Sequence, residues 1–269
     1  MIILQKILYI IFNKVKEILI FPLFYFDDVS SRIWLKKKYS FYQDVERAIV
    51  HTKQQGFRFA EYFFSHYFLR YSGWALSKSS IRYFCGEVFS GREKPIIVEF
   101  GGGASTIFWN NFSMEFSLHS YEHDFVWFKK LNSYISNNQK ITLIFSSLRQ
   151  FSDTEKITLF QKCTLPSLSC NNYTDNKDTS AKNLFYNIRP NDFPLQKIDA
   201  LVLDGPHGNG RSMAFPLFRD YLKPGSIVLI DDFNHYPFLD DLSKVFEYKV
   251  IKEFKSPFKR KSWTLLRLV

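Results

Sequence analysis

Cysteine is scarce in this chain of 269 residues, which contains only Cys85, Cys163 and Cys170. A low and odd number of cysteines argues against a disulfide framework and favours a reducing compartment. No CxxC spacing or neighbouring histidine supports a zinc site. We therefore expect three plain thiols and a cytoplasmic protein.

A long uncharged apolar run is also lacking, because Lys6, Lys14, Lys16 and Glu17 interrupt the apolar residues 1–26. A membrane-spanning helix needs about 20 nearly uncharged apolar residues, and a signal peptide needs an uninterrupted apolar stretch followed by small residues. The segment fits neither. Its apolar residues recur at helical spacing and share one face: Leu4, Ile7, Leu8, Ile11, Phe12, Val15, Ile18 and Leu19. Pro22 is expected to end this helix.

Two interpretations of this amphipathic segment remain open. In one, residues 1–26 lie in a membrane interface with their lysines toward lipid phosphates, which would place the protein at the inner face of the membrane. In the other, the helix packs on the rest of the chain or on a partner subunit.

Nucleic-acid-binding signatures are missing as well, although the formal charge is +10 and the sequence pI is about 9.3. Residues 249–269 hold seven Lys and Arg against one acid, Glu253. Most of the excess therefore lies near the chain ends, outside the cofactor site expected below. We interpret it as a solvated basic surface and expect no specific nucleic-acid partner.

From residue 95, short apolar runs alternate with helical segments, which predicts an α/β fold with a mainly parallel sheet covered on both faces. The expected strands are Pro95–Phe100, Ser117–Tyr121, Lys140–Phe145, Ile198–Leu203, Ser226–Ile230, Glu247–Phe254 and Ser262–Val269. The expected helices between them are Ser105–Asn111, Phe125–Ile135, Arg211–Tyr221 and Pro237–Val245.

The expected organisation has three parts: an amphipathic segment at 1–40, a helical lead-in at 41–94, and the main domain at 95–269. Residues 146–197 are too long for an ordinary connection between a strand and a helix. We interpret them as an insertion over the active site, either a lid or substrate element or a loop without a catalytic part.

Chemistry is expected at the carboxyl ends of the parallel strands, where ligands bind in doubly wound sheets. The first strand ends in a glycine loop, the second in an acid, and the fourth and fifth in aspartates. The residues at these ends are Glu99, Gly101, Gly102, Gly103, Ser105, Thr106, Glu122, His123, Asp204, Asp231 and Asp232. Consecutive glycines permit close backbone approach to a ligand, and an acid after the second strand can accept hydrogen bonds from ribose hydroxyls.

The order VEFGGGAST, YEHD, DALVLDGPHG and LKPGSIVLIDD resembles the class I S-adenosylmethionine (SAM)-dependent methyltransferases over residues 95–269. Within that superfamily it is similar to bacterial sugar and natural-product O-methyltransferases. The resemblance implies a Rossmann-like, doubly wound, seven-stranded sheet, mostly parallel with an antiparallel last strand and preceded by N-terminal helices. It also implies SAM as cofactor and a small-molecule or saccharide acceptor.

The resemblance further implies residue roles. Glu99 would orient the glycine loop or meet the methionine amino group, and Gly101 and Gly103 would line the methionine and ribose portion. Glu122 would hold the ribose hydroxyls, His123 would flank the adenine, and Asp204 would lie beside the sulfonium.

We also expect a divalent cation to bind at the carboxyl ends of the parallel strands. Asp204, Asp231 and Asp232 end adjacent strands, and three oxygen ligands completed by water suit Mg²⁺ or another divalent cation. The alternative is that Asp231 and Asp232 are structural. His207 and His235 lie on the flanking loops and are candidates, with Asp204, for the catalytic base. Arg211 would hold an anionic substrate group or pair with a nearby acid.

Two other functions fit parts of the pattern. An NAD(P)-dependent oxidoreductase shares the fold and the acid, but Thr106 stands where the third glycine of the dinucleotide fingerprint would fall. A catalytically silent SAM-binding protein would keep the acids and glycines without turnover.

Overall fold

The computed structural model describes residues 21–54, 75–135, 138–163, 182–188, 197–256 and 261–269. A seven-stranded sheet has the order β3-β2-β1-β6-β7-β9-β8. Its strands are β1 (Ile96–Phe100), β2 (Ser117–Glu122), β3 (Ile141–Phe145), β6 (Ile198–Leu203), β7 (Leu222–Asp231), β8 (Tyr248–Lys255) and β9 (Ser262–Leu268). Neighbours from β3 to β7 are parallel, whereas β9 is antiparallel to both β7 and β8. The predicted Rossmann-like fold class is confirmed.

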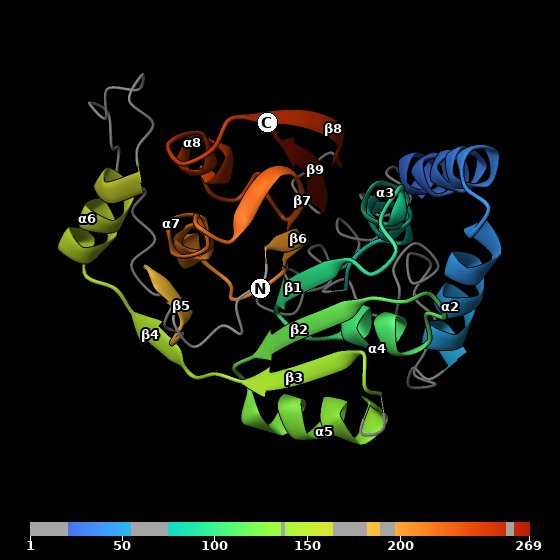
Figure 1. The fold of residues 1–269 in the computed structure, drawn as a ribbon, viewed down its shortest axis with the longest axis horizontal. Helices are drawn as coiled ribbons and strands as arrows, with labels where there is room; N and C mark the ends of the chain where they lie inside the picture. Colours follow the sequence, from blue (N-terminus) through green and yellow to red (C-terminus); the bar gives the residue numbers. More distant parts are fainter. Residues whose placement is uncertain (1–20, 55–74, 136–137, 164–181, 189–196, 257–260) are drawn as a thin grey trace, which may run out of the picture.

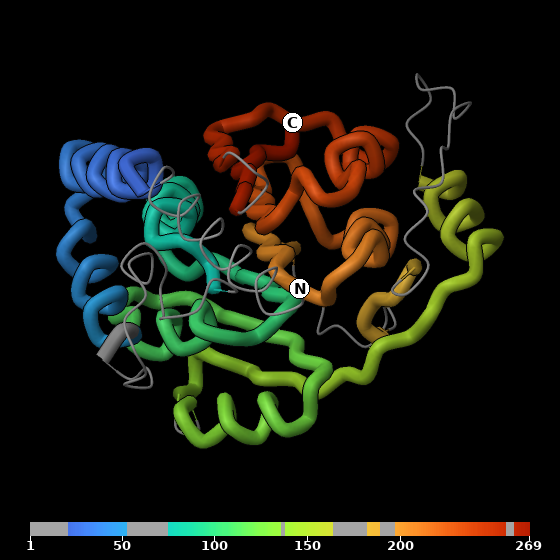
Figure 2. Tube along the Cα trace, turned by 180° about the vertical axis from the view of Figure 1, so that it is seen from behind, coloured from blue at the N-terminus to red at the C-terminus, as the bar shows by residue number. Residues whose placement is uncertain are grey.

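Alternate residues of the central strands enter two separate hydrophobic cores, as expected for a sheet covered on both faces. Ile97 and Ala200 belong to one core and Val98 and Leu201 to the other. The first core includes residues of α2 (Tyr42–Gln54), α3 (Lys78–Phe89) and α4 (Ala104–Asn110). The second includes residues of α7 (Ala214–Leu217) and α8 (Phe238–Ser243). Figures 1 and 2 show these helix groups on opposite sides of the sheet, with α5 (Phe125–Ile135) beside β3.

Most predicted elements form close to their expected ends, and α5 and β6 agree at both ends. The predicted helix Arg211–Tyr221 is an exception. A 3-10 turn, η3 (Asn209–Met213), and the short helix α7 take its place. Pro216 would lie in the interior of the predicted helix, where it could not donate the helical hydrogen bond, so a continuous helix from Arg211 is disfavoured.

The insertion at 146–197 contains regular structure where it is described. It includes β4 (Leu148–Gln150), α6 (Asp153–Cys163) and β5 (Leu184–Tyr186), and β4 and β5 pair antiparallel. Phe185 and Tyr186 are fully buried in the second core. At least this part of the insertion is therefore built into the domain, and β4, β5 and α6 extend along one side of the molecule (Figure 1).

Residues 21–38 are helical, and Pro22 lies in this helical segment. The expected end of the preceding helix at Pro22 depends on residues that are not described. Residues 1–20 lie outside the described part of the chain. Phe24 contacts the ring of Phe254 at a centroid distance of 5.6 Å, and Leu35 is fully buried. Residues 21–38 thus pack on the domain, and no helix among the described residues is long and apolar enough to cross a membrane.

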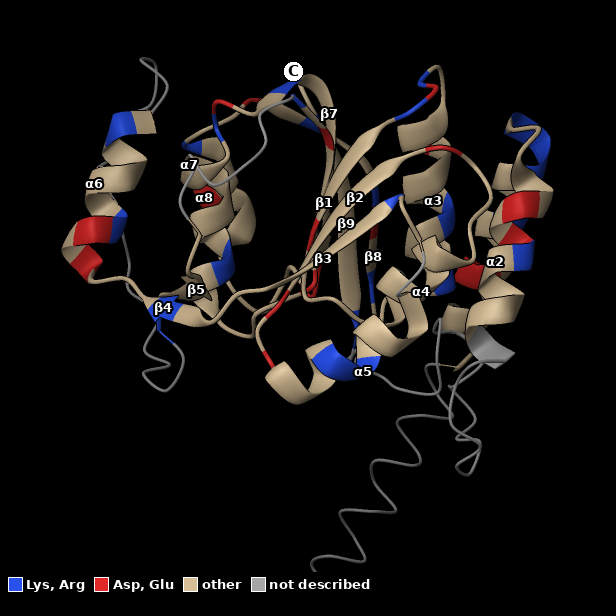
Figure 3. Ribbon diagram, turned by 60° about the horizontal axis from the view of Figure 1, so that its bottom comes forward, with Lys and Arg blue, Asp and Glu red and all other residues tan. Residues whose placement is uncertain are grey.

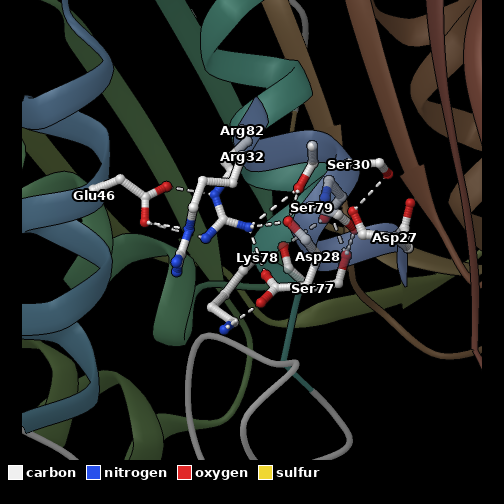
Figure 4. Close-up of polar contacts among 11 residues, drawn as sticks. Asp27, Asp28, Ser30, Arg32, Glu46, Ser77, Lys78, Ser79 and Arg82 are labelled. Atoms are coloured by element: carbon white, nitrogen blue, oxygen red, sulfur yellow. Dashed lines mark hydrogen bonds and ion pairs between the residues drawn. The ribbon is translucent and has the colours of Figure 1, made fainter. Parts of the chain in front are cut away.

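A buried ion cluster, formed by Asp28, Glu46, Lys78 and Arg82, connects residues 21–38 to α2 and α3 (Figure 4). The Arg82 guanidinium donates to both carboxylate oxygens of Glu46, at 2.5 and 3.2 Å, and to Asp28 Oδ1 at 2.5 Å. Lys78 Nζ donates to Asp28 Oδ2 at 3.0 Å. We call these four residues the N-terminal ion cluster.

Charged residues otherwise lie mainly on the outer helices and on the edge strand β8, while the central strands are largely uncharged (Figure 3). This distribution agrees with a solvated charged surface. Lys261, one of the lysines of residues 249–269, is an exception because it is buried.

Candidate cofactor and catalytic site

The glycine loop after β1 and the turn after β6 contact each other through backbone atoms. Phe100 O accepts hydrogen bonds from the amides of Asp204 and Gly205, at 2.9 and 2.7 Å. Gly101 has a φ of +95°, and a Cβ there would lie 2.5 Å from Gly205 N. Only glycine suits this position, because a side chain would clash and would also strain the left-handed backbone. The two loops thus form a close backbone cradle where β1 and β6 meet.

Glu99 lies beneath this cradle and holds it together. Its Oε2 accepts hydrogen bonds of 2.7 Å from the hydroxyls of Thr106 and Ser120. Thr106 Oγ1 in turn accepts the amide of Gly103 at 2.9 Å. Burial raises the pKa of Glu99. The expected role of Glu99 in orienting the loop therefore has a structural basis, with Ser120 as a partner that the sequence did not reveal.

Glu99 Oε1 and the Ser105 hydroxyl lie beside this network and make no other hydrogen bond in the described part of the chain. Ser105 acts on the Glu99 carboxyl as a hydrogen-bond donor, which lowers the pKa of Glu99. A carboxylate oxygen can accept more than one hydrogen bond, so a ligand donor can be added here. An ammonium group, such as that of a methionine moiety, is a donor of suitable charge for the carboxylate.

Glu122 ends β2, one strand away from the glycine loop. Its Oε1 accepts the amides of His123 and Asp124, both at 2.7 Å, which fixes the carboxylate. Oε2 makes no hydrogen bond within the described residues and remains able to accept two ligand hydroxyls. Burial raises the pKa of Glu122 and lowers that of His123, so the imidazole tends to be neutral beside this carboxylate.

Tyr186 of β5 reaches this place from the insertion. Its hydroxyl lies 3.5 Å from His123 Nδ1, and 3.2 Å from where a Cβ on Gly205 would be. Burial raises the pKa of Tyr186 well above its usual value, so the phenol is neutral. The insertion therefore contributes a buried hydroxyl between the acid of β2 and the turn after β6.

The three aspartates gather as expected at the ends of β6 and β7, but around a lysine. The carboxyls of Asp204 and Asp231 are within reach of a side-chain hydrogen bond, and burial raises the pKa of both. Lys261 Nζ contacts Asp231 Oδ2 and lies 3.9 Å from Asp232 Oδ1. We call Asp204, Asp231, Asp232 and Lys261 the acidic cluster.

The predicted metal site does not agree with this arrangement. No group of three or more His, Cys, Asp or Glu side chains in the described ranges is arranged to hold a metal ion. One Asp231 oxygen, Oδ2, is bonded to the buried ammonium of Lys261, and a hard cation at this place would lie close to that positive charge. The assignment of Asp204, Asp231 and Asp232 as metal ligands therefore stays a prediction, which the position of Lys261 disfavours.

The remaining candidates lie on the flanking loops. His207 and His235 are both exposed, and the His207 ring is 6.1 Å from that of Tyr236. Their role as bases stays a prediction. Arg211 is buried and donates to the backbone carbonyls of Pro206 and Asp231, at 2.8 and 2.6 Å. It connects the two loops of the site and does not have the exposed position expected of a ligand for an anionic substrate.

Tyr186, Lys261 and Ser120 were missed by sequence reasoning. Lys261 was counted with the basic surface, because nothing in the run Lys259-Arg260-Lys261 separates a buried lysine from its neighbours. A cavity of about 860 Å³ lies elsewhere, lined among others by Lys94, Ser117 and Lys140 near the amino ends of the strands. None of the candidate site residues lines it.

Comparison with known proteins gives a likeness in structure only. No family model and no curated protein matches the sequence. The fibrillarin pre-rRNA processing protein of Methanococcus jannaschii is similar with a TM-score of 0.41 and 10% identity, over 66% of this chain and 67% of that one. Fibrillarin of Aeropyrum pernix, in complex with natively bound S-adenosyl-L-methionine, has a TM-score of 0.40 and 11% identity, over 65% and 67%.

An rRNA methylase of Streptococcus thermophilus has a TM-score of 0.42 and 11% identity, over 71% of this chain and 96% of that one. At this level these likenesses assign no activity to the chain.

Proposed function

We propose that this chain is a class I SAM-dependent methyltransferase that methylates an oxygen of a sugar or another small hydroxylated acceptor. The observation that carries the proposal is the pairing of the Gly101–Gly205 backbone cradle with the carboxylate of Glu122. Glu122 Oε2 suits the hydroxyls of a ribose, and the Glu99 carboxylate, which can accept a further hydrogen bond, suits an amino group. Both features match what a nucleoside linked to an amino acid offers.

Bound SAM supplies an electrophilic methyl group. Glu99, Gly101, Gly102 and Gly103 would hold its amino-acid portion, with Ser105 and Thr106 at the start of α4. Glu122 and His123 would hold the nucleoside. A half-buried carboxylate whose pKa is raised is a better base than a solvated one, so Asp204 suits the role of accepting the proton of the acceptor hydroxyl. No step requires a divalent cation.

Calorimetry tests whether the chain binds SAM as its methyl donor. The affinities for SAM and for NADH are measured with wild type, Glu122→Gln and Glu115→Gln. The amide keeps the size of the side chain and loses its charge and acceptor strength, so we expect SAM affinity to fall roughly tenfold in Glu122→Gln. Glu115 is exposed and pairs with Lys140 near the amino edge of the sheet, so Glu115→Gln is the matched control. Binding of NADH but not SAM would favour the oxidoreductase.

The acceptor is tested separately by mass spectrometry after incubation with SAM and a panel of sugars and small hydroxylated compounds. A mass gain of one methyl group on an oxygen is expected. SAM binding without any methylated product across the panel would favour the catalytically silent protein.

Peripheral membrane contact through residues 1–26 is a further proposal, supported by apolar side chains on the outside of the described helix. Tyr25 and Phe26 are exposed, Phe26 by 74%, and Lys36, Lys37 and Lys38 follow them. Flotation with anionic liposomes is expected to weaken in Tyr25→Ser/Phe26→Ser. Binding equal to that of wild type would contradict the proposal.

A further inference from the structure

Lys261 is a buried cation that the proposed methyl transfer does not use. Its side chain is 2% exposed, and its ammonium contacts Asp231 with Asp232 nearby. The three surrounding carboxylates raise its pKa and outweigh the effect of burial, which lowers it. The ammonium thus lies inside the acidic cluster, in contact with one carboxylate and 3.9 Å from a second.

The position of Lys261 is fixed by backbone pairing on both sides. Lys261 O accepts the amide of Ser256 at 2.9 Å, and Lys261 N donates to Ser256 Oγ at 2.8 Å. The next residue, Ser262, accepts the amide of Asp232 at 2.7 Å through its carbonyl oxygen, and Trp263 is paired with Asp231 in the sheet. The register of β7 and β9 thus brings Lys261 to the carboxyl end of β7.

Two buried cations, Lys261 and Arg211, act on the acidic cluster. Lys261 and Arg211 both act electrostatically on Asp204, and Arg211 also holds the backbone of Asp231. Asp231 Oδ1 has no donor in the described part of the chain, but it can share a proton with Asp204. A divalent ion would have to displace or approach a buried ammonium, and like charges repel strongly in such surroundings.

We infer that Lys261 is the built-in counter-cation of the acidic cluster, in the place where the sequence pattern predicts a divalent metal. It is a positioning residue that holds Asp231 and, through it, Asp204. The inference concerns the cluster itself and goes beyond the proposed methyl transfer, since it holds whether or not the chain binds SAM.

Removal of this ammonium should convert the cluster into a cation site, because three carboxylates would be left without their counter-charge. The Tm of the full chain is measured in the presence of EDTA, MgCl₂ or MnCl₂. Binding of Mn²⁺ is measured by electron paramagnetic resonance, which reports the concentration of free Mn²⁺. Wild type is expected to show no response to either metal. Lys261→Met is expected to lose roughly 10 °C in Tm and to regain part of it with Mn²⁺, while Mn²⁺ is bound.

Lys156→Met is the matched control, because Lys156 is equally buried and its Nζ lies 3.6 Å from the carboxylate of Asp241. This variant should lose stability without gaining a response to metal. The double variant Asp231→Asn/Lys261→Met removes both charges, so we expect it to recover most of the lost Tm and to bind no Mn²⁺. It also keeps the test informative if Lys261→Met does not fold.

Three results would overturn the inference. The first is Mn²⁺ binding by wild type that is lost when Asp231 is substituted. The second is a rise in the Tm of folded Lys261→Met with Mn²⁺ that is no larger than that of Lys156→Met. The third is a Tm of the double variant no higher than that of Lys261→Met. Failure of wild type to bind SAM would contradict the proposed function and leave these outcomes unaffected.

Discussion

The two buried ion clusters of this protein differ in how completely their charges are paired. In the N-terminal ion cluster, Arg82 bonds both oxygens of Glu46 and also Asp28, and Lys78 takes the other oxygen of Asp28. In the acidic cluster, three carboxylates face one ammonium, and Asp231 Oδ1 lacks a donor. A saturated cluster stabilises the fold and has little capacity left for a ligand, whereas an unsaturated one is less favourable for folding and suits chemistry.

The largest expected effect is on stability, from Arg82→Met. This change leaves Asp28 and Glu46 buried without their main partner, which costs roughly 3–5 kcal/mol. Chemical denaturation measures the free energy of unfolding. Arg32→Met is the control, because Arg32 also contacts Glu46, at 3.4 Å, but is 51% exposed. It should change stability by less than about 1 kcal/mol, and an equal loss in both variants would contradict the comparison.

The next effect is on activity, from Asp204→Asn. We expect methyl transfer to fall by at least about 100-fold, because a general base contributes that much or more. Burial raises the pKa of Asp204, so the neutral amide should leave the Tm unchanged or raise it. Single-turnover kinetics measure the rate of methyl transfer, and thermal unfolding measures the Tm. A large drop in Tm would show that Asp204 is paired as fully as Asp28.

A smaller effect is the acid response of the N-terminal ion cluster. Burial acts to raise the pKa of Asp28, but Arg82 and Lys78 outweigh it, and the net pKa is below the ordinary 3.8. Stability from Asp28 is therefore present above pH 3.8 and is lost as the pH falls through the lower folded-state pKa. The difference in unfolding free energy between wild type and Asp28→Asn should be constant near neutral pH and shrink only below 3.8. If the difference in unfolding free energy already shrinks near pH 6, the pKa of Asp28 is not lowered in the folded protein.

The smallest effect is expected from Tyr186→Phe, which removes a hydroxyl that belongs to neither cluster. Its contact with His123 is long, at 3.5 Å, and a single neutral hydrogen bond contributes about 1 kcal/mol. Stability should change by no more than that, and SAM affinity by less than tenfold. Loss of SAM binding measured by calorimetry would instead make Tyr186 a main determinant of the site.

Local sequence was sufficient for the elements and loops of the sheet. The apolar run Ile198–Leu203 became β6 with the predicted ends, because a buried parallel strand is apolar on both faces. The glycines after β1 and the acid after β2 also lie where their spacing predicts. These features are encoded within a few residues, by apolar periodicity and by backbone freedom.

Tertiary structure alone decided which charges meet. Lys261 and Asp231 are 30 residues apart, and Arg82 and Asp28 are 54 apart. Their contacts follow from the antiparallel register of β9 on β7 and from the packing of residues 21–38 on α3. No periodicity distinguishes Lys261 from Lys259, because a lysine becomes a structural counter-ion only when folding removes it from water beside an acid. Hence the sequence by itself determined the fold class and the strand ends at which the candidate site residues lie, and only the tertiary structure placed the ammonium of Lys261 beside Asp231.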